Sequence, residues 1–258
     1  MTEADWLACT DSRRMLLYLL GLRDPCRVTD IPSFPDCKGS DRKLRLFACA
    51  CYARVRHLLP SPLARAAVEV AERFADGDDK REFRQVRADL YQTLEGLEGE
   101  WRASRGAQRT ALQPTHEALA LALQIVRPEA PKAAYYASSN AYLSLASIAN
   151  PNAASSDSTF FASQTAEARA QTELLRCIFG PLPFRRVSLD ATGLAWEGST
   201  TRKLAEAIYD ERAFDHLPIL ADALEDAGCD NADLLSHCRQ PGAHVRGCWV
   251  VDLLLGKE

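Results

Sequence analysis

The chain has 258 residues, of which 47% are hydrophobic and 26% charged, and its formal net charge is −4 at pH 7. These values are typical of a globular protein and exclude the disordered, collagen-like and long coiled-coil classes. The apolar runs are far shorter than the roughly 20 residues of a membrane-spanning helix, and the acidic start MTEADW does not resemble a secretory signal. We therefore expect a cytoplasmic protein without a membrane partner.

Apolar residues recur at helical spacing through most of the N-terminal half. Thr2 and Asp5 have the spacing of a capping box, and the helical period that follows ends near Gly21. Ser40 is suited to cap the next helix, and Pro62 to begin the one after it. The helices predicted after Gly21 cover 41–59, 62–74, 80–105, 115–127 and 132–149.

The C-terminal half continues the helical pattern. Residues 151–158 are small and polar and are the best candidate for a loop or domain boundary. Residues 181–199 are the least helical and could hold a short strand pair. The apolar segment 245–255 fits either a buried helix or a central strand, which periodicity does not distinguish. The other helices predicted in this half cover 160–179, 201–210, 216–227 and 231–239.

These elements predict an all-α, or nearly all-α, protein, built as an irregular multi-helix bundle or a short helical array. One helical domain over 1–258 is the favoured organisation. The alternative is a split into helical regions 1–150 and 159–258 that are joined by the loop 151–158.

Several stretches of the chain resemble one bacterial protein family. They are MTEADWLACTDSRRML, SDRKLRLFACACYARVRHLL, AVEVAERFADG and the tail, whose signature is ADALEDAGC…HVRGCWVVDLLLGKE. The resemblance covers both ends and about half of the chain. This family occurs in large paralogous sets and has no assigned function. The resemblance therefore implies a bacterial, cytoplasmic and helical protein, and it implies no activity, cofactor or site residue.

Charge and motifs exclude several function classes. Residues 197–233 hold ten carboxylates against three basic residues and would repel phosphate backbones, so a nucleic-acid partner is not expected. The sequence has no GxxxxGK[ST] phosphate loop, no GxGxxG, no GxSxG nucleophile elbow and no HExxH zinc helix. No enzyme class is therefore predicted. A catalytic site formed by residues that are distant in the sequence is still compatible with it.

The tail holds the chain's densest group of metal-ligand residue types. His244 and Cys248 are four residues apart, and His237 and Cys238 come just before the turn that leads to them. Zinc takes about four such nitrogen and sulfur ligands in a tetrahedron. The hypothesis is a zinc site made of His237, Cys238, His244 and Cys248. The alternative is that the cysteines, including Cys229, pack as small apolar residues, since nine cysteines without a secretion signal are expected to be reduced.

A second candidate is the polar side of the helix predicted over 41–59. Arg42, Arg56 and His57 share this side with Cys49, so a reactive thiol or a bound anion is conceivable there. Lys43, Arg45 and Arg54 lie on the same side. The favoured alternative is a solvated basic face.

Two function classes follow. The favoured one is a helical protein-interaction or regulatory module with an unidentified protein partner and no cofactor. The alternative is a metal- or thiol-dependent protein, an enzyme included, that uses the C-terminal Cys/His cluster with zinc.

Overall fold

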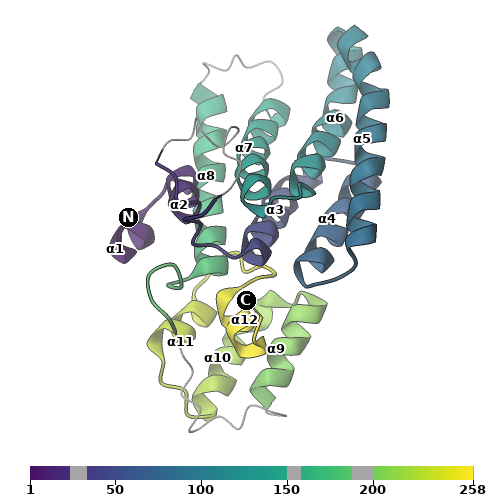
Figure 1. Ribbon diagram of the computed structural model, residues 1–258. Coiled ribbons are helices and arrows are strands. Elements are labelled where there is room, and N and C mark those ends of the chain that lie inside the picture. The colour runs from purple at the N-terminus through teal and green to yellow at the C-terminus, as the bar shows by residue number, and fades with distance from the viewer. Residues whose placement is uncertain (24–33, 150–157, 188–199, 258) are drawn as a thin grey trace. The chain divides into compact units, whose positions relative to one another are not determined.

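The computed structural model describes residues 1–23, 34–149, 158–187 and 200–257, and all regular secondary structure in these ranges is helical (Figure 1). The predicted all-α class is confirmed. The chain forms two compact units, Cys9–Thr172 and Met1–Ala8 with Glu173–Glu258. The boundary lies within α8 (Ser158–Phe179), and the loop predicted at 151–158 is outside the described residues apart from Ser158. No helix in the described ranges is both long and apolar enough to cross a membrane.

The unit Cys9–Thr172 is built around α3 (Asp41–Val55), which packs against three neighbouring helices. Every residue from Lys43 to Tyr52 is buried. This helix begins as predicted, because the Ser40 side chain accepts a hydrogen bond from the Lys43 N–H at 3.3 Å. The other elements are α2 (Ser12–Leu19), η2 (Arg56–Leu58), α4 (Pro62–Ala75), α5 (Lys80–Ala103), α6 (Gly106–Ile125), α7 (Ala130–Ala149) and the first part of α8.

The side of α3 that was expected to be polar and solvated is in part buried, as Arg45 shows. Its side chain is only 3% exposed, and Lys43 beside it is buried as well. Three main-chain carbonyls at the end of α6 and two aromatic rings satisfy the buried guanidinium. The carbonyls belong to Ile125, Arg127 and Pro128, at 3.1, 2.9 and 3.0 Å, and the rings to Phe74 and Phe83. Ile125 is the last residue of α6 and its carbonyl has no further helical N–H to bind, whereas Arg127 and Pro128 follow the helix. Arg45 therefore caps α6 from the core.

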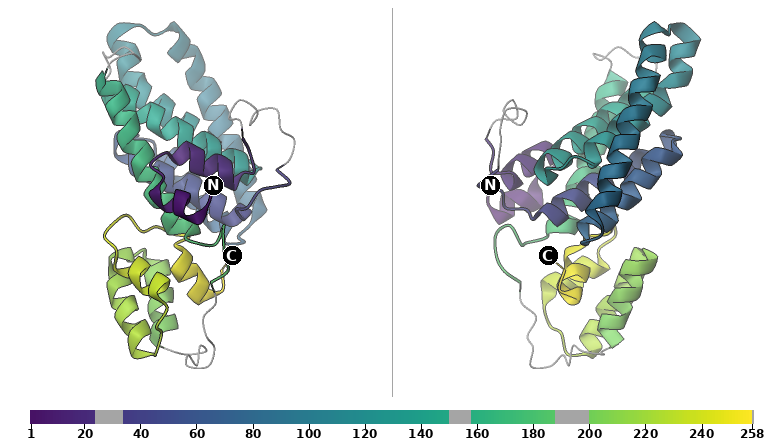
Figure 2. Two further views of the ribbon diagram at one scale, coloured as in Figure 1. Left: turned by 90° about the vertical axis from the view of Figure 1, so that its left-hand side faces the viewer. Right: turned by 45° about the vertical axis from the view of Figure 1, so that its right-hand side comes forward.

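Helix α6 begins earlier than the sequence predicted. The expected start was residue 115, after Pro114, but the helix runs from Gly106 with Pro114 inside it. A proline removes one helical N–H and usually bends or ends a helix. Here α5 packs along α6, and the two run side by side as a long hairpin (Figures 1 and 2). Tertiary packing thus offsets the local cost of the proline.

The second unit holds the C-terminal helices. The segment 245–255, which fitted both a helix and a strand, forms helix α12 from Trp249 to Leu255. No strand occurs over 181–187, and 188–199 lie outside the described residues. The remaining elements are α1 (Glu3–Ala8), the end of α8, α9 (Thr200–Glu211), η3 (Phe214–His216), α10 (Leu217–Asp226) and α11 (Ala232–Arg239).

The core of this unit forms where α9, α10, α11 and α12 meet (Figure 1). Ile208, Leu220, Leu224 and Val250 are fully buried there. The capping box predicted at the N-terminus is present in α1: the Asp5 N–H donates to Thr2 Oγ1 at 3.1 Å, and the Thr2 N–H donates to Asp5 Oδ2 at 2.8 Å. The predicted capping box and the predicted apolar faces of the helices are thus both found in this unit.

Candidate metal centre

Four side chains of the C-terminal unit converge on one point. They are Cys177, His237, His244 and Cys248, and one ligand atom of each lies within 4.8 Å of the others. His244 is half-buried and the other three residues are buried. Two thiols and two imidazoles are a typical donor set for zinc, whereas magnesium and calcium prefer oxygen ligands.

Each ligand comes from the end of a helix or from a turn. Cys177 is in the last turn of α8 and His237 in the last turn of α11. Cys248 is the N-cap residue of α12. Its N–H donates to the Val245 carbonyl at 2.9 Å and closes a turn in which Gly247 has a φ of +91°. Glycine adopts this conformation without strain, so the turn brings Cys248 back toward α11.

Two distances between ligand atoms match those of a tetrahedral zinc site. His237 Nε2 lies 3.3 Å from Cys248 Sγ, and His244 Nδ1 lies 3.6 Å from Cys177 Sγ. Zn–S bonds of about 2.3 Å and Zn–N bonds of about 2.0 Å in a tetrahedron place neighbouring ligand atoms roughly 3.3–3.8 Å apart. These two separations are therefore those of a tetrahedral zinc site, and none of the six separations among the four ligand atoms exceeds 4.8 Å.

Gln240 contacts the second nitrogen of both imidazoles. Its side-chain amide nitrogen lies 3.0 Å from His237 Nδ1, and its main-chain carbonyl lies 3.3 Å from His244 Nε2. Turning the amide by 180° places its oxygen at Nδ1 instead. Histidine ligands of metals almost always donate this second N–H to a carbonyl or carboxylate, which fixes the tautomer. His237 is thus arranged to bind through Nε2 and His244 through Nδ1.

The electrostatics of the cluster favour the thiolate form of Cys248. Burial alone would raise the pKa of the Cys248 thiol, but a hydrogen bond with Cys177 and the imidazole of His237 lower it well below its ordinary value. Burial alone would lower the pKa of His244, but its hydrogen bond with Cys248 raises it. A thiolate is the form of cysteine that binds zinc, so the lowered pKa of Cys248 favours binding. The raised pKa of His244 favours its imidazolium, which loses its proton when the metal binds.

The structure brings together three of the four predicted ligands and adds one. His237, His244 and Cys248 lie in the cluster, whereas the fourth position belongs to Cys177 and not to Cys238. Consecutive helical residues such as His237 and Cys238 point about 100° apart, so only one of them faces the cluster. Cys238 belongs to the apolar core, where burial raises its pKa to about 12.

The second candidate, the face with Arg42, Cys49, Arg56 and His57, does not form a site. Cys49 is 1% exposed and therefore is not on a solvated face. Arg42 pairs with Asp76, with Nε–Oδ1 at 3.0 Å. Arg56 and His57 are exposed in η2, beyond the end of α3. The expectation was wrong for Cys49 because α3 is surrounded by other helices and has no solvated side at that level.

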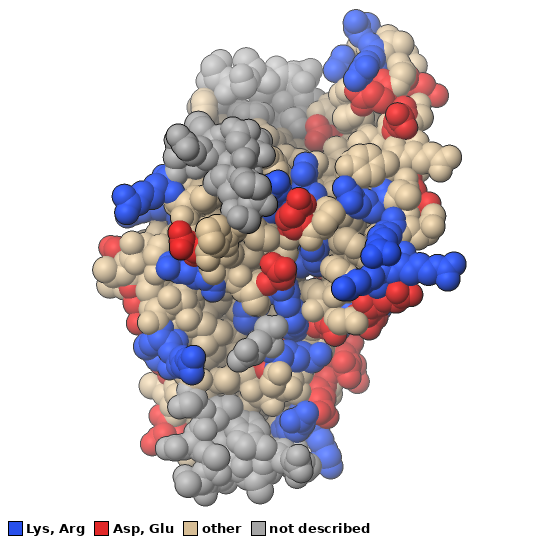
Figure 3. Space-filling model, viewed as in Figure 1, with Lys and Arg blue, Asp and Glu red and all other residues tan. Residues whose placement is uncertain are grey.

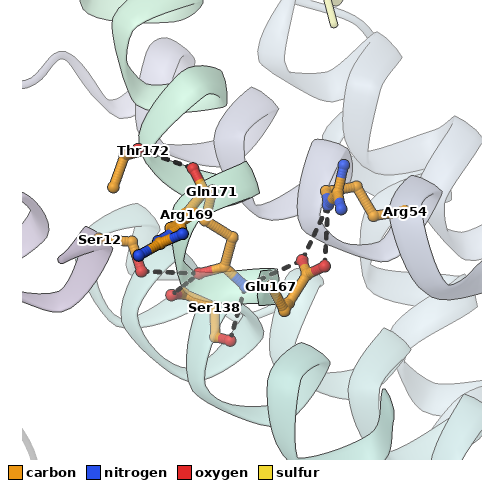
Figure 4. Close-up of polar contacts among 7 residues, drawn as sticks. All are labelled: Ser12, Arg54, Ser138, Glu167, Arg169, Gln171 and Thr172. Carbon is orange, nitrogen blue, oxygen red and sulfur yellow. Dashed lines mark hydrogen bonds and ion pairs between the residues drawn. The ribbon is translucent and has the colours of Figure 1, made fainter. Parts of the chain in front are cut away.

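The other buried polar cluster lies in the unit Cys9–Thr172. Glu167 of α8 is 2% exposed and accepts hydrogen bonds from Arg54 Nε at 2.9 and 3.0 Å. One turn further, Gln171 accepts from the hydroxyls of Ser12 and Ser138 and donates to the Ser138 carbonyl (Figure 4). Each of these side chains has a partner within the unit, so the cluster holds α8 against α2, α3 and α7.

A scan against protein-family models, a search of curated proteins and a search of solved structures each found no match to this chain.

Proposed function

We propose that the C-terminal unit is a zinc-binding helical module in which Cys177, His237, His244 and Cys248 hold the metal. The convergence of these four ligand atoms within 4.8 Å carries the proposal. The contacts of Gln240 with both imidazoles support it, because they fix the ring nitrogens that face the cluster.

The proposed metal has a structural role. Four protein ligands complete a tetrahedron, whereas catalytic zinc sites usually keep one position for water or substrate. The ligands come from the end of α8, from α11 and from the start of α12. Helices as short as α11 and α12, with eight and seven residues, are marginal by themselves in water. A shared metal would hold their ends in register.

Metal content is the experiment that tests this function. We expect protein purified under reducing conditions without a metal-chelating tag to hold about one zinc per chain. A double variant with His244→Ala and Cys248→Ala should hold almost none. Cys238→Ala is the matched control, because this cysteine is also buried on the same segment but is not in the cluster, and it should keep the metal. No zinc in the wild-type chain after loading and desalting would contradict the proposal.

The protein-interaction role stays a prediction. The large apolar side chains that are exposed in the described ranges belong to six separate segments of the chain. They are Leu7, Tyr91, Leu143, Phe161, Leu182 and Ile219. On the face shown in Figure 3, basic and acidic side chains lie close together, which is typical of a solvated surface.

A further inference from the structure

One of the ligand cysteines, Cys177, lines a cavity. This cavity of about 140 Å³ is lined by Cys177 and His244, by Glu173 and Arg176 of α8, and by the segment 240–243. Residues 241–243 are exposed, so one wall of the cavity is at the protein surface. A small neutral molecule can therefore reach Cys177, whereas Cys248 is 0% exposed and does not line this cavity.

The two ligand sulfurs are also close to each other. Cys177 Sγ and Cys248 Sγ lie within 4.8 Å, and a hydrogen bond joins the two thiol groups. Both residues are at the end of a helix, one in the last turn of α8 and the other capping α12. A modest side-chain movement would bring the sulfurs to the roughly 2 Å of a disulfide bond.

Other buried cysteines are in less reactive surroundings. Burial raises the pKa of Cys51 well above its ordinary value and that of Cys238 to about 12. Such thiols stay protonated near neutral pH and react slowly with peroxides. The sulfurs of a zinc centre, by contrast, are thiolates.

We propose that the Cys177–Cys248 pair is a site of oxidative modification by hydrogen peroxide, and that its oxidation to a disulfide releases the zinc. This inference rests on the proposed function. The cavity admits the oxidant to Cys177 first, and Cys248 is the thiolate that resolves the first product.

The chemistry balances with peroxide alone as the oxidant. The Cys177 thiolate attacks one peroxide oxygen, the O–O bond breaks, and the departing hydroxide takes a proton to become water. The resulting sulfenic acid is attacked by the Cys248 thiolate. The S–S bond then forms, the S–O bond breaks, and the second hydroxide takes a proton. Two thiolates thus lose two electrons, and one peroxide and two protons become two water molecules.

Oxidation removes both sulfur ligands at once. Only His237 and His244 remain, and two imidazoles do not complete the tetrahedron that zinc requires. Release of the metal frees the segment between α11 and α12 from the end of α8. Peroxide would therefore loosen the packing of the C-terminal helices by removing their shared metal.

The test uses the zinc-loaded full chain. Peroxide is added in increments, released zinc is measured with a chromogenic chelator, and free thiols are alkylated before digestion with trypsin. The expected result is one zinc released for each disulfide. The disulfide should join the tryptic peptide 177–185 to the peptide 247–257. Cys229 and Cys238 share a different peptide, 213–239, so the possible pairings are distinguishable.

Two variants sharpen the test. Cys238→Ala should release zinc as the wild type does. Ala243→Leu fills part of the cavity from an exposed position and should slow release several-fold with the zinc content unchanged. An unchanged rate in this variant would overturn the cavity as the entry route.

The remaining outcomes separate the two proposals. Zinc that is bound but not released by peroxide, or a disulfide that involves Cys238, would overturn only the oxidation site. A chain that never holds zinc would overturn the metal centre, and the release mechanism with it.

Discussion

The side-chain amide of Gln240 lies 3.0 Å from Nδ1 of His237, on the side of the ring opposite to Cys248. The structure places the amide nitrogen of Gln240 at this contact. With zinc on Nε2, the Nδ1 nitrogen carries the proton, and its N–H donates to the amide oxygen once the amide is turned by 180°. The two ends of an amide are interchangeable in such a contact. Gln240 therefore sets the orientation of His237 without binding the metal itself.

Gln240→Ala should weaken zinc binding about tenfold, at the low end of the usual effect of removing such a partner. The loss is partial because the main-chain carbonyl that faces His244 remains. Gln240→Glu keeps an acceptor and should retain most of the affinity. Competition with a chromogenic chelator measures the change.

Arg239→Ala is the control for this prediction. Arg239 is the preceding residue, and its guanidinium pairs with the exposed carboxylates of Asp222 and Glu225. Its removal should leave zinc affinity unchanged. Equal affinities for Gln240→Ala and wild type would contradict the role given to Gln240.

Gly180→Ala should destabilise the C-terminal unit through contact with Trp249. Gly180 has a φ of +49°, and a Cβ there would lie 2.6 Å from Trp249 Cδ1. Trp249 in turn packs against His237, with ring centroids 5.4 Å apart. Gly228 has a φ of +86° with open space around it, so Gly228→Ala should cost only the backbone strain, roughly 1–2 kcal/mol.

The steric contact should make Gly180→Ala costlier than Gly228→Ala by about 1–3 kcal/mol. Denaturant unfolding of the zinc-loaded protein measures both variants. Equal losses of stability would show that Trp249 moves aside at little cost.

Arg45→Met should destabilise the unit Cys9–Thr172 by about 2–4 kcal/mol, because it leaves one buried and two part-buried carbonyls without this donor. Burial lowers the pKa of Arg45, and the carbonyls and aromatic rings offset this cost of burial. Arg56→Met, at an exposed position beyond α3, should change stability by less than about 0.5 kcal/mol. Similar losses for the two variants in urea unfolding would exclude a capping role for Arg45.

Glu167 gives the unit Cys9–Thr172 a dependence on pH. Burial raises the pKa of this carboxyl, and the opposing effect of Arg54 is smaller. A raised carboxyl pKa means that folding favours the protonated form. Stability from this group is therefore complete below the ordinary pKa of glutamate and is lost as pH rises through the raised value.

Glu167→Gln removes that titration and keeps the size of the side chain. The stability of the variant relative to wild type should rise between about pH 4 and neutrality. Unfolding free energies measured across this range test the prediction. A constant difference would mean that Glu167 has the same pKa in the folded and unfolded chain.

Most helices could be predicted from the sequence because their caps and apolar periods are local. Ser40, Pro62 and the Thr2–Asp5 pair mark real helix starts. The early start of α6 was missed because packing against α5 outweighs the local effect of Pro114. The burial of Arg45 was missed because its partners are main-chain carbonyls, which no side-chain pattern reveals.

Only those ligands of the candidate metal centre that are close together in the sequence could be predicted. His237, His244 and Cys248 stand within twelve residues of one another, which signals a cluster. Cys177 precedes His244 by 67 residues and lies in a different helix. Only the fold shows that the end of α8 meets the turn before α12, and that Cys238 faces the apolar core.

X-ray absorption at the zinc edge of the loaded chain identifies the ligand atoms of the metal. The expected result is two sulfur neighbours at about 2.3 Å and two imidazole nitrogens at about 2.0 Å. The sulfur signal should fall by half in Cys177→Ser and stay unchanged in Cys238→Ala. A shell of oxygen and nitrogen alone, or a sulfur signal that depends on Cys238 and not on Cys177, would contradict the Cys177–His237–His244–Cys248 centre.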